Sequence, residues 1–396
     1  MKKTVFIIGA GMNAQSITRE GMDAIASSEV LFGSPRLLEA FRTLVKQSFP
    51  FYRPADVLRE IKKSEMNRFA VLVSGDVGFF SGAPALCEAL ADFDTRLIPG
   101  ISSVQAFSAK LKIPWQDFKL SSLHGASANI VDLVRRNRYV LCLTGGNTAE
   151  IGQRLAARGF SDIKIYAGEN LGYENEKITA MTARGLCSAN LAILTVLLIV
   201  NENRDDRART GIPDGEFSRL EGIPMTKSEV RAVVSSKLGL TPGSVCYDIG
   251  AGTGSVAVEM ALSAYDGQVY AIEKEEKALP LIEENLVKFN IGNVTPVHGK
   301  APQALRDLPT PDAAFIGGSS GEMADIVEAL IFKNPEVRIV TTSIALESAA
   351  AALFALKKAF SNTEIVQINA ARSKPAGDLS MMTAQNPVMI LSGGGK

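Results

Sequence analysis

The sequence predicts an α/β protein made of two domains. Short apolar runs rich in β-branched residues, such as TVFIIG at residues 4–9, alternate with amphipathic stretches of helical period. A chain of 396 residues is longer than one hydrophobic core usually supports, because domains commonly hold about 100 to 200 residues. Residues 201–217 are polar, dense in charge and interrupted by glycine and proline, as linkers are. We therefore expect domains at residues 1–205 and 206–396.

The first half alternates strands and helices from its start. The expected elements are a strand at 4–9, a helix at 14–27, a strand at 30–34, a helix at 35–46, and strands at 69–74, 95–98, 139–144, 164–167 and 191–200. The run at 191–200 is about half as long as the roughly 20 residues that a membrane-spanning helix needs. We therefore interpret it as a buried strand and expect no membrane span.

The second half begins a new α/β series. Thr226 and Glu229 have the spacing of a capping box, which predicts a helix directly after them. The strands expected beyond that helix lie at 244–249 and in QVYAIEKE, before VHGKAP, and in DAAFIGGSSG. No internal repeat relates this series to the first half. The sequence thus predicts two unrelated folds joined in one chain.

The segment VCYDIGAGTGSVAVEMA joins an apolar strand to a helix through a glycine-rich turn. Asp248 ends the strand, and three glycines follow at alternate positions: Gly250, Gly252 and Gly254. Such a turn lets the backbone approach a ligand at the helix N-terminus. The next strand ends in Glu273, whose carboxylate can there accept hydrogen bonds from both hydroxyls of a ribose.

The spacing of these glycines favours S-adenosylmethionine over a dinucleotide. The turn is GxGxG, whereas dinucleotide-binding turns favour GxGxxG, which leaves room for a pyrophosphate. Without a pyrophosphate, Asp248 can face the ammonium group of the methionine moiety. We expect S-adenosylmethionine here, with NAD, FAD or a purely structural turn as the alternatives.

The adenine end of this site departs from the usual pattern. Methyltransferases of this type often carry an acid after the third strand for the adenine amine, but this chain has Lys300 there. We expect a backbone contact near Ala301 instead. The fourth strand ends in Gly317 and Gly318, which should border the donor because ligands lie beyond the carboxyl ends of strands. A plain tight turn is the alternative for these two glycines.

Composition excludes several classes of function. Lysine and arginine together equal aspartate and glutamate at 42 each, so no overall charge favours nucleic acid or an anionic membrane. The cysteines, Cys87, Cys142, Cys187 and Cys246, lie far apart without CxxC spacing, which predicts buried thiols in a reducing cytoplasm. The chain has 2 histidines, so we do not expect a metal site.

A nominal dinucleotide fingerprint, GxGxxA, occurs in FIIGAGMNA after the first strand. The acid about 20 residues further on, Glu29, precedes the next strand instead of ending it. A carboxylate in that position would not reach a ribose. A dinucleotide site is therefore the weaker interpretation of this motif.

A second loop in the first half is more informative. FAVLVSGDVGFFSGAPAL places a glycine-rich loop and two aromatic residues between a strand and a helix, and LIPGISSVQAFSAKLKIPW follows it. Together with PWQDFKLSSLHG, LTGGNT and GENLGYENEKI, these segments follow the order of the tetrapyrrole methylase family, which residues 4–200 resemble. Val77 departs from the family's GDPG loop. The resemblance implies two α/β subdomains with S-adenosylmethionine bound in the cleft between them.

The resemblance also implies which residues of the first half contact ligands. Carried over by position, the donor contacts are Gly75, Asp76, Phe79, Ser102, Ser103, Leu143 and the turn at Gly168 and Glu169. Asp76 could instead cap the helix that follows it. His124 is expected on the substrate side, with a structural histidine as the alternative. Ala126 and Ser127 replace an Arg-Pro pair that family members often have after HG, which removes one guanidinium from the substrate side.

The second half resembles Rossmann-like class I methyltransferases that methylate and decarboxylate the same macrocycle. The matching segments are IPDGEF, PMTKSEVRA, DIGAGTGSVAVE, FIGGS and NAARSKPAGDLSMMTAQNPVMIL. The pairing of the two halves implies a fused enzyme of cobalamin synthesis that acts on a precorrin-type tetrapyrrole. It implies two methyl transfers to meso carbons of the ring, loss of carbon dioxide from an acetate arm, and a homo-oligomer.

The many carboxylates of such a substrate need cations close by. Segments of the second half that match the family contribute four candidates: Lys227, Arg231, Arg372 and Lys374. Solvated surface charge is the alternative for each of them. A double replacement of Arg372 and Lys374 that left substrate affinity unchanged would exclude a carboxylate clamp.

The sequence assigns no catalytic nucleophile. An electron-rich macrocycle is itself the nucleophile and the electron sink, so the protein has mainly to align the reacting atoms and exclude water. Two other functions stay open at this point. One is a nicotinamide- or flavin-linked oxidoreductase that uses the GxGxxA motif, and the other is a noncatalytic tetrapyrrole-binding protein.

Overall fold

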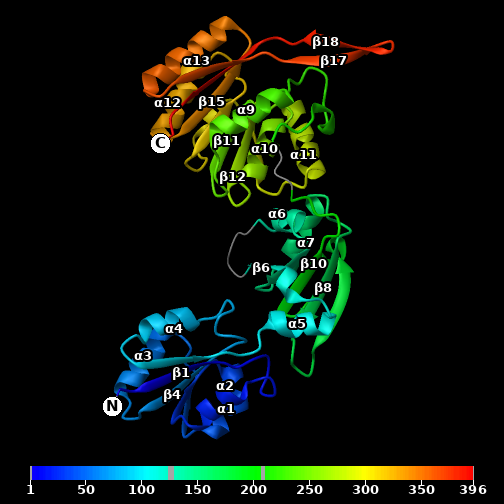
Figure 1. Cartoon of the computed structure of the whole chain (residues 1–396). Helices are drawn as coiled ribbons and strands as arrows, with labels where there is room; N and C mark the ends of the chain where they lie inside the picture. Colours follow the sequence, from blue (N-terminus) through cyan, green and yellow to red (C-terminus); the bar gives the residue numbers. More distant parts are fainter. Residues whose placement is uncertain (1, 124–128, 207–209, 396) are drawn as a thin grey trace. The chain divides into compact units, whose positions relative to one another are not determined.

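The computed structural model describes residues 2–123, 129–206 and 210–395 of the chain. The chain divides into two compact units. The first holds residues 1–127, 137–151 and 163–203, and the second holds 128–136, 152–162 and 204–396. Figure 1 colours the chain along its length, from blue at the N-terminus to red at the C-terminus.

The first unit opens with a parallel sheet of five strands in the order β3-β2-β4-β1-β5. Its strands are β1 (Thr4–Gly9), β2 (Val30–Phe32), β3 (Gln47–Phe49), β4 (Arg68–Val73) and β5 (Asp94–Ile98). Its helices are α1 (Arg19–Ala26), α2 (Pro35–Phe41), α3 (Pro54–Lys63) and α4 (Ala83–Ala89), with the 3-10 turn η1 (Arg42–Leu44). Helices α1 and α2 pack on one face, and α3 and α4 on the other. Both faces of the strands are therefore buried.

A second, mixed sheet completes the first unit, in the order β6-β7-β10-β8-β9. Its strands are β6 (Phe118–Ser122), β7 (Tyr139–Leu143), β8 (Lys164–Glu169), β9 (Lys177–Thr182) and β10 (Thr195–Val200). The helical segments in this part of the chain are α5 (Ser103–Leu111), η2 (Trp115–Asp117), α6 (Ile130–Arg136), α7 (Thr148–Ala157) and α8 (Ala183–Leu186), of which α6 and the end of α7 belong to the second unit. Strand β10 is central and buried at every position, which confirms a buried strand in the apolar run at 191–200.

The second unit contains a seven-stranded sheet in the order β13-β12-β11-β14-β15-β19-β16. Its strands are β11 (Val245–Ile249), β12 (Gln268–Glu273), β13 (Val294–His298), β14 (Ala313–Ile316), β15 (Arg338–Ser343), β16 (Glu364–Ile368) and β19 (Val388–Gly393). Helices α9 (Ser228–Leu238), α10 (Ser255–Ser263) and α11 (Leu279–Lys288) cover one face, and α12 (Met323–Lys333) and α13 (Leu346–Ala359) cover the other. The short turns η3 (Asp214–Glu216), η4 (Glu276–Ala278) and η5 (Gln303–Leu305) complete the unit. Strand β19 alone runs antiparallel to its neighbours β15 and β16.

A two-stranded hairpin, β17 (Ala371–Ala376) and β18 (Leu379–Ala384), projects from the seven-stranded sheet (Figure 1). Strand β18 is exposed along its whole length, including the apolar side chains of Leu379, Met381 and Met382. In the described ranges, no helix is long and apolar enough to cross a membrane.

The starts of two helices differ from what the sequence predicts. Helix α1 starts at Arg19 and not at residue 14. The preceding chain forms a turn instead, in which the Ser16 Oγ and the Asn13 Oδ1 and carbonyl oxygen accept hydrogen bonds of 2.7–3.1 Å from backbone N–H groups. The capping box expected at Thr226 is wrong. The carboxylate of Asp214 accepts a hydrogen bond from the Ser228 backbone N–H at 2.9 Å, so a distant residue caps α9.

Candidate functional site

A cavity of about 420 Å³ in the second unit lies at the carboxyl ends of β11, β12 and β14. The strand order reverses at β11, and open α/β sheets bind ligands beside such a point. The cavity wall brings together most of the residues predicted to bind a methyl donor: Asp248, Gly250, Gly252, Glu273, Ala301 and Gly317. Gly254 does not line the wall but immediately precedes α10, which starts at Ser255.

Two glycines of the GxGxG turn are needed for two reasons: neighbouring backbone leaves no room for a Cβ, and their φ angles are positive. Gly250 has φ 75°, and a Cβ added to it would lie 2.8 Å from the Gly318 nitrogen. Gly252 has φ 55°, and a Cβ there would lie 2.7 Å from the Pro224 carbonyl oxygen. Both conformations are ones that side-chain-bearing residues rarely adopt. The turn therefore presents bare backbone to the cavity.

Asp248 is a buried acid with one unused oxygen. Its Oδ2 accepts a hydrogen bond of 2.8 Å from the Ala257 backbone N–H, while its Oδ1 has no partner among the described residues. Burial raises the pKa of this carboxyl to about 7; the Ala257 hydrogen bond lowers it, and nearby Glu273 raises it further. A cationic group in the cavity would satisfy the free oxygen and stabilise the ionised form.

Glu273 supports the turn and also faces the cavity. Its Oε2 accepts a hydrogen bond from the Gly252 N–H at 2.8 Å, and its Oε1 accepts one from the Glu275 N–H at 2.9 Å. Each carboxylate oxygen can accept more than one hydrogen bond, so ribose hydroxyls can still bind there.

At the other end of this cavity, Lys300 is held by an acid from the next loop. Its Nζ lies 2.8 Å from Oε1 of Glu322, which immediately precedes α12. Ala301 lines the cavity beside Lys300, and Gly317 lies close to the carbonyl of Gly250. The ion pair joins two loops of the cavity wall. Sequence reasoning missed two further parts of this wall: Ile223, Pro224 and Thr226 before α9, and Ser319 and Ser320 after β14.

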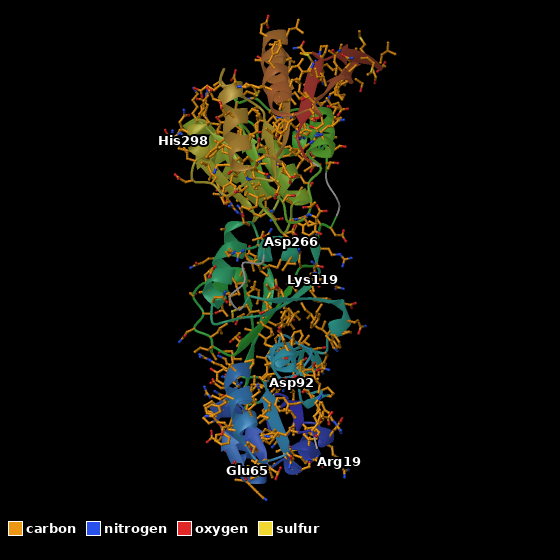
Figure 2. All side chains as sticks on the ribbon, turned by 90° about the vertical axis from the view of Figure 1, so that its left-hand side faces the viewer. Arg19, Glu65, Asp92, Lys119, Asp266 and His298 are labelled. Carbon is orange, nitrogen blue, oxygen red and sulfur yellow. The ribbon has the colours of Figure 1, made fainter. Side chains whose placement is uncertain are left out.

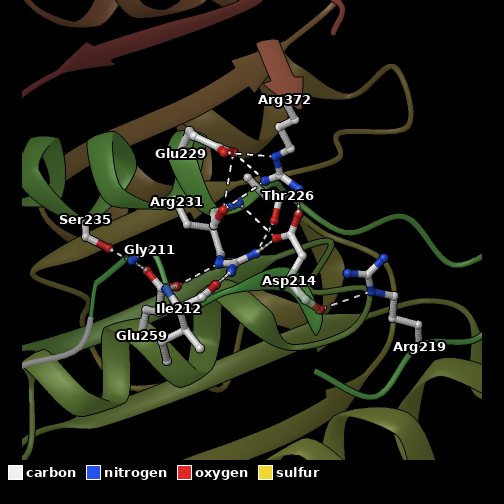
Figure 3. A network of polar contacts seen from close by, with 11 residues as sticks. Gly211, Ile212, Asp214, Arg219, Thr226, Glu229, Arg231, Ser235, Glu259 and Arg372 are labelled. Carbon is white, nitrogen blue, oxygen red and sulfur yellow. Dashed lines mark hydrogen bonds and ion pairs between the residues drawn. The ribbon is translucent and has the colours of Figure 1, made fainter. Parts of the chain in front are cut away.

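Two of the basic residues predicted to bind the substrate form ion pairs within the protein instead. Arg231 is fully buried between the carboxylates of Asp214 and Glu259, at 3.1 and 2.7 Å, and donates to the carbonyls of Ile212 and Thr226 (Figure 3). The expectation that it contacts a substrate is corrected, because no ligand can reach its guanidinium. Its partners Asp214, Ile212 and Glu259 lie 17 to 28 residues away in the sequence, so no local pattern predicts them.

Arg372 is engaged in the same network. Its guanidinium lies 2.8 Å from Asp214 and 2.5 Å from Glu229 (Figure 3), and these two contacts tie the hairpin to η3 and to α9. The hydrogen bond from Arg372 lowers the pKa of Glu229 to about 2. The structure thus gives Arg372 an anchoring role where the sequence suggested a clamp. Lys227 and Lys374 are exposed and stay predictions.

The first unit contains a separate cavity of about 600 Å³. Six of the predicted donor-binding residues line it: Gly75, Asp76, Phe79, Ser102, Ser103 and Leu143. Asp76 does not cap α4, which starts at Ala83. Its carboxylate instead accepts hydrogen bonds from the N–H groups of Gly78 at 2.8 Å and Gly100 at 3.0 Å, and so joins two loops of the wall.

Gly168 and Glu169 are not in a turn, which corrects the prediction. Both lie within β8, and neither lines the cavity. Glu169 accepts a hydrogen bond of 2.9 Å from the Ala192 N–H, and its Oε1 is buried without a partner in the described chain. The turn starts one residue later, at Asn170, and this residue does line the cavity. His124, Ala126 and Ser127 lie outside the described residues.

The GxGxxA motif has a packing role. A Cβ on Gly100 would lie 2.5 Å from the Gly9 carbonyl oxygen and closer still to the carbonyl oxygen of Gly75. Gly11 forms an isolated bridge with Gly75. The glycines after β1, β4 and β5 thus let three loops meet at the carboxyl end of the sheet. Sequence reasoning missed other cavity residues nearby, among them Met12, Arg36, Tyr173 and Leu194.

The remaining candidate groups take no part in either cavity. All four cysteines are free, and burial raises the pKa of Cys142 and Cys246 to about 12, whereas Cys87 and Cys187 are only half-buried. His298 is exposed (Figure 2). Its Nε2 lies 3.2 Å from the Lys274 carbonyl oxygen. In the part of the chain that the structure describes, no group of three or more His, Cys, Asp or Glu side chains could hold a metal ion.

Each half of the chain matches a different family. Residues 4–187 match the model of the tetrapyrrole (corrin/porphyrin) methylases, and residues 219–393 match that of a precorrin methyltransferase domain. A precorrin-6Y C(5,15)-methyltransferase [decarboxylating] from Sinorhizobium sp is 30% identical over 397 residues, which cover 97% of this chain and 94% of that protein.

Other relatives match about half of the chain. A probable cobalt-precorrin-6B C(15)-methyltransferase (decarboxylating) from Pyrobaculum calidifontis is 44% identical over 187 residues, covering 47% of this chain and 96% of that protein. The solved structure of precorrin-6y C5,15-methyltransferase from Geobacter metallireducens GS-15 is 37% identical, with a TM-score of 0.45, and covers 47% of this chain and 97% of that one.

Proposed function

Because this chain belongs to the precorrin-6Y C(5,15)-methyltransferase (decarboxylating) family, we propose that it methylates a precorrin-type tetrapyrrole of cobalamin synthesis at C5 and C15. The same proposal includes loss of the C12 acetate carboxyl as carbon dioxide. It assigns C5 methylation to a domain at residues 1–205, and C15 methylation with decarboxylation to a domain at 206–396. The relatives named C(15)-methyltransferase (decarboxylating), which match less than half of this chain but nearly their own full length, support this division.

The observation that carries the proposal in the second domain is the unsatisfied Oδ1 of Asp248 beside a bare glycine turn. S-adenosylmethionine has the groups that this wall lacks: an ammonium for Asp248 and ribose hydroxyls for Glu273. Bound there, it would supply an electrophilic methyl group on a sulfonium.

The role of the protein is then to hold the donor and the macrocycle in position. The turn at Gly250 and Gly252 admits the donor close to the backbone, while Asp248 and Glu273 fix its two ends. The macrocycle is the nucleophile and takes up the electron pair left when carbon dioxide departs, so alignment and exclusion of water are what the walls must provide.

In the first domain, the proposed donor site is the cavity lined by Gly75, Ser102 and Leu143. The carboxylate of Asp76 is already shared between two backbone N–H groups, so its proposed role there is to shape the loops. The oxidoreductase alternative loses its main support, because Gly9 and Gly11 contact other backbone and not the cavity.

The proposal is tested by incubating residues 1–205, residues 206–396 and the whole chain with the tetrapyrrole and S-adenosylmethionine, followed by mass spectrometry. The first fragment is expected to add one methyl group. The second is expected to add one methyl group and lose one carbon dioxide. A second fragment that bound the donor but yielded no decarboxylated product would overturn the assignment.

A further inference from the structure

A guanidinium group lies at the first cavity without being part of any predicted site. Arg36 belongs to the first turn of α2, directly after β2, and its exposed side chain lines the cavity. It donates a hydrogen bond to the Tyr173 hydroxyl, and its guanidinium carbon lies 5.5 Å from the centroid of that ring. A second nitrogen lies 3.5 Å from the Ser74 hydroxyl oxygen. The group therefore has neutral partners on two sides.

This cation has no carboxylate partner in the described part of the chain. Asp76 is an acid that lines the same cavity, but its two carboxylate oxygens accept hydrogen bonds from the N–H groups of Gly78 and Gly100. The charge of Arg36 is thus left available to a ligand. A planar guanidinium binds a carboxylate through two parallel hydrogen bonds, and adjacent hydroxyls can donate further ones.

The partner ring is held in place by its own loop. The Tyr173 N–H donates to the Asn170 carbonyl at 2.9 Å, and the Gly172 N–H donates to Glu176 at 2.6 Å. Glu176 is in turn 2.7 Å from Lys110 on α5. Because the loop is fixed at both ends, Tyr173 can orient Arg36 before a ligand arrives.

Exposed apolar side chains surround the same cavity. Phe80, Ile193 and Leu194 line it with 58%, 76% and 45% of their surface exposed. Single exposed apolar residues are common, but several that line one cavity indicate a ligand with an apolar surface. A ligand that fits both features is flat and apolar with carboxylates at its edge.

We propose that Arg36, Tyr173 and Ser74 form a carboxylate-binding subsite that holds one acidic arm of the macrocycle in the first domain. The proposal rests on the proposed function, which supplies a polycarboxylate ring as the substrate. The methionine carboxylate of the donor is a second source of the same chemical group. The two sources are separated by measuring ring binding and donor binding independently.

The test compares Arg36→Ala, Arg36→Lys and Tyr173→Phe in the whole chain. The matched control is Arg59→Ala, since Arg59 is an exposed arginine on α3 whose partner is Asp56. Four quantities are measured: the KM and the kcat for C5 methylation, the Kd of S-adenosylmethionine, and the Kd of uroporphyrin, a stable tetrapyrrole with carboxylate arms. Thermal unfolding checks that each variant is folded.

Loss of a charge-assisted contact in Arg36→Ala should raise KM and the Kd of uroporphyrin roughly tenfold or more, with kcat near that of the wild type. Arg36→Lys should recover part of the loss, Tyr173→Phe should show a smaller one, and the control should show none. A loss confined to the donor would overturn the assignment to the macrocycle, because the carboxylate bound there would be that of the methionine moiety.

If Arg36→Ala changed neither the Kd of S-adenosylmethionine nor the Kd of uroporphyrin, the subsite would be overturned. A wild type that bound neither uroporphyrin nor the tetrapyrrole substrate would overturn it as well. A wild type without turnover, whose uroporphyrin binding is nevertheless weakened by Arg36→Ala, would refute the proposed function and leave the subsite standing. The failures of the two proposals are therefore distinguishable.

Discussion

Asp248 combines burial with charge in a way that makes its ionisation sensitive to the ligand. Its carboxyl is 1% exposed and has one oxygen without a partner in the described structure. The raised pKa of about 7 follows from that burial. Because one oxygen of this carboxyl has no hydrogen-bond partner among the described residues of the ligand-free protein, a cationic ligand that binds there adds a contact without breaking an existing one.

Replacing Asp248 with asparagine should stabilise the donor-free protein more at pH 8 than at pH 5. The folded pKa of about 7 lies above the unfolded value near 4, so the contribution of this carboxyl to wild-type stability is fully present below pH 4 and is lost as the pH rises through about 7. Each unit of that difference is worth about 1.4 kcal/mol. Thermal unfolding of residues 206–396 at both pH values measures the effect.

The control for this substitution is Asp266→Asn, because Asp266 is an exposed acid of the same unit (Figure 2). The same variant of Asp248 should bind S-adenosylmethionine at least tenfold more weakly, since the ammonium loses its counter-ion. Equal stability gains at pH 5 and pH 8 would contradict the assigned ionisation.

Between elements, the buried network around Arg231 connects segments that the sequence separates widely. It links Asp214 in η3, α9 and Glu259 in α10, and Arg372 extends it to the hairpin. Glu259 also accepts hydrogen bonds from the N–H groups of Gly211 and Ile212 at 2.9 and 3.0 Å. The chain that enters the second unit is therefore attached to its core by ionic contacts.

Arg231→Ala should lower the free energy of unfolding of the second unit by about 3 kcal/mol, because it leaves two buried carboxylates without their cation. Lys237→Ala on the same helix is the matched control. Its partner Glu364 is half exposed, so the loss should stay below about 1 kcal/mol. Urea denaturation of both variants provides the comparison, and equal losses would contradict the role given to Arg231.

Gly100→Ala should disrupt the first unit, since its Cβ would overlap the carbonyl oxygens of Gly9 and Gly75. We expect a loss of at least about 2 kcal/mol in stability and loss of C5 methylation, with C15 methylation retained. Gly82→Ala, which meets no atom within 4 Å, is the control and should behave as the wild type. A stable, active Gly100→Ala would show that the three loops can separate.

The alternation of strands and helices was predictable from the sequence because it depends on local periodicity. The ends of β11 and β12, and hence Asp248 and Glu273, could be located for the same reason. The roles of Arg231 and Arg372 could not, because they depend on partners up to 158 residues away. Arg36 was missed similarly, since its companion Tyr173 lies 137 residues further on.

At the scale of the whole molecule, two cavities in two units predict two donor sites per chain. Glu273→Ala should remove the donor site of the second unit alone. Calorimetric titration with S-adenosylmethionine should then fall from two sites per chain to one. The product should carry a single added methyl group and keep the carboxyl group of its C12 acetate arm.

Glu65→Ala in the first unit changes an exposed acid and is a suitable control (Figure 2). It should leave two donor sites and the doubly methylated product. A Glu273→Ala variant that still bound two donors with wild-type affinity would exclude the proposed ribose contact.

The meeting of Gly9, Gly75 and Gly100 also limits how this chain can evolve. Every amino acid that a single nucleotide change can substitute for glycine carries a Cβ. At Gly9 and Gly100 the nearest obstacle to that atom is backbone, which cannot rotate away as a side chain can. We therefore expect no replacement of Gly9 or Gly100 to be neutral. Sequence change around the first cavity must occur instead at the residues whose side chains line it.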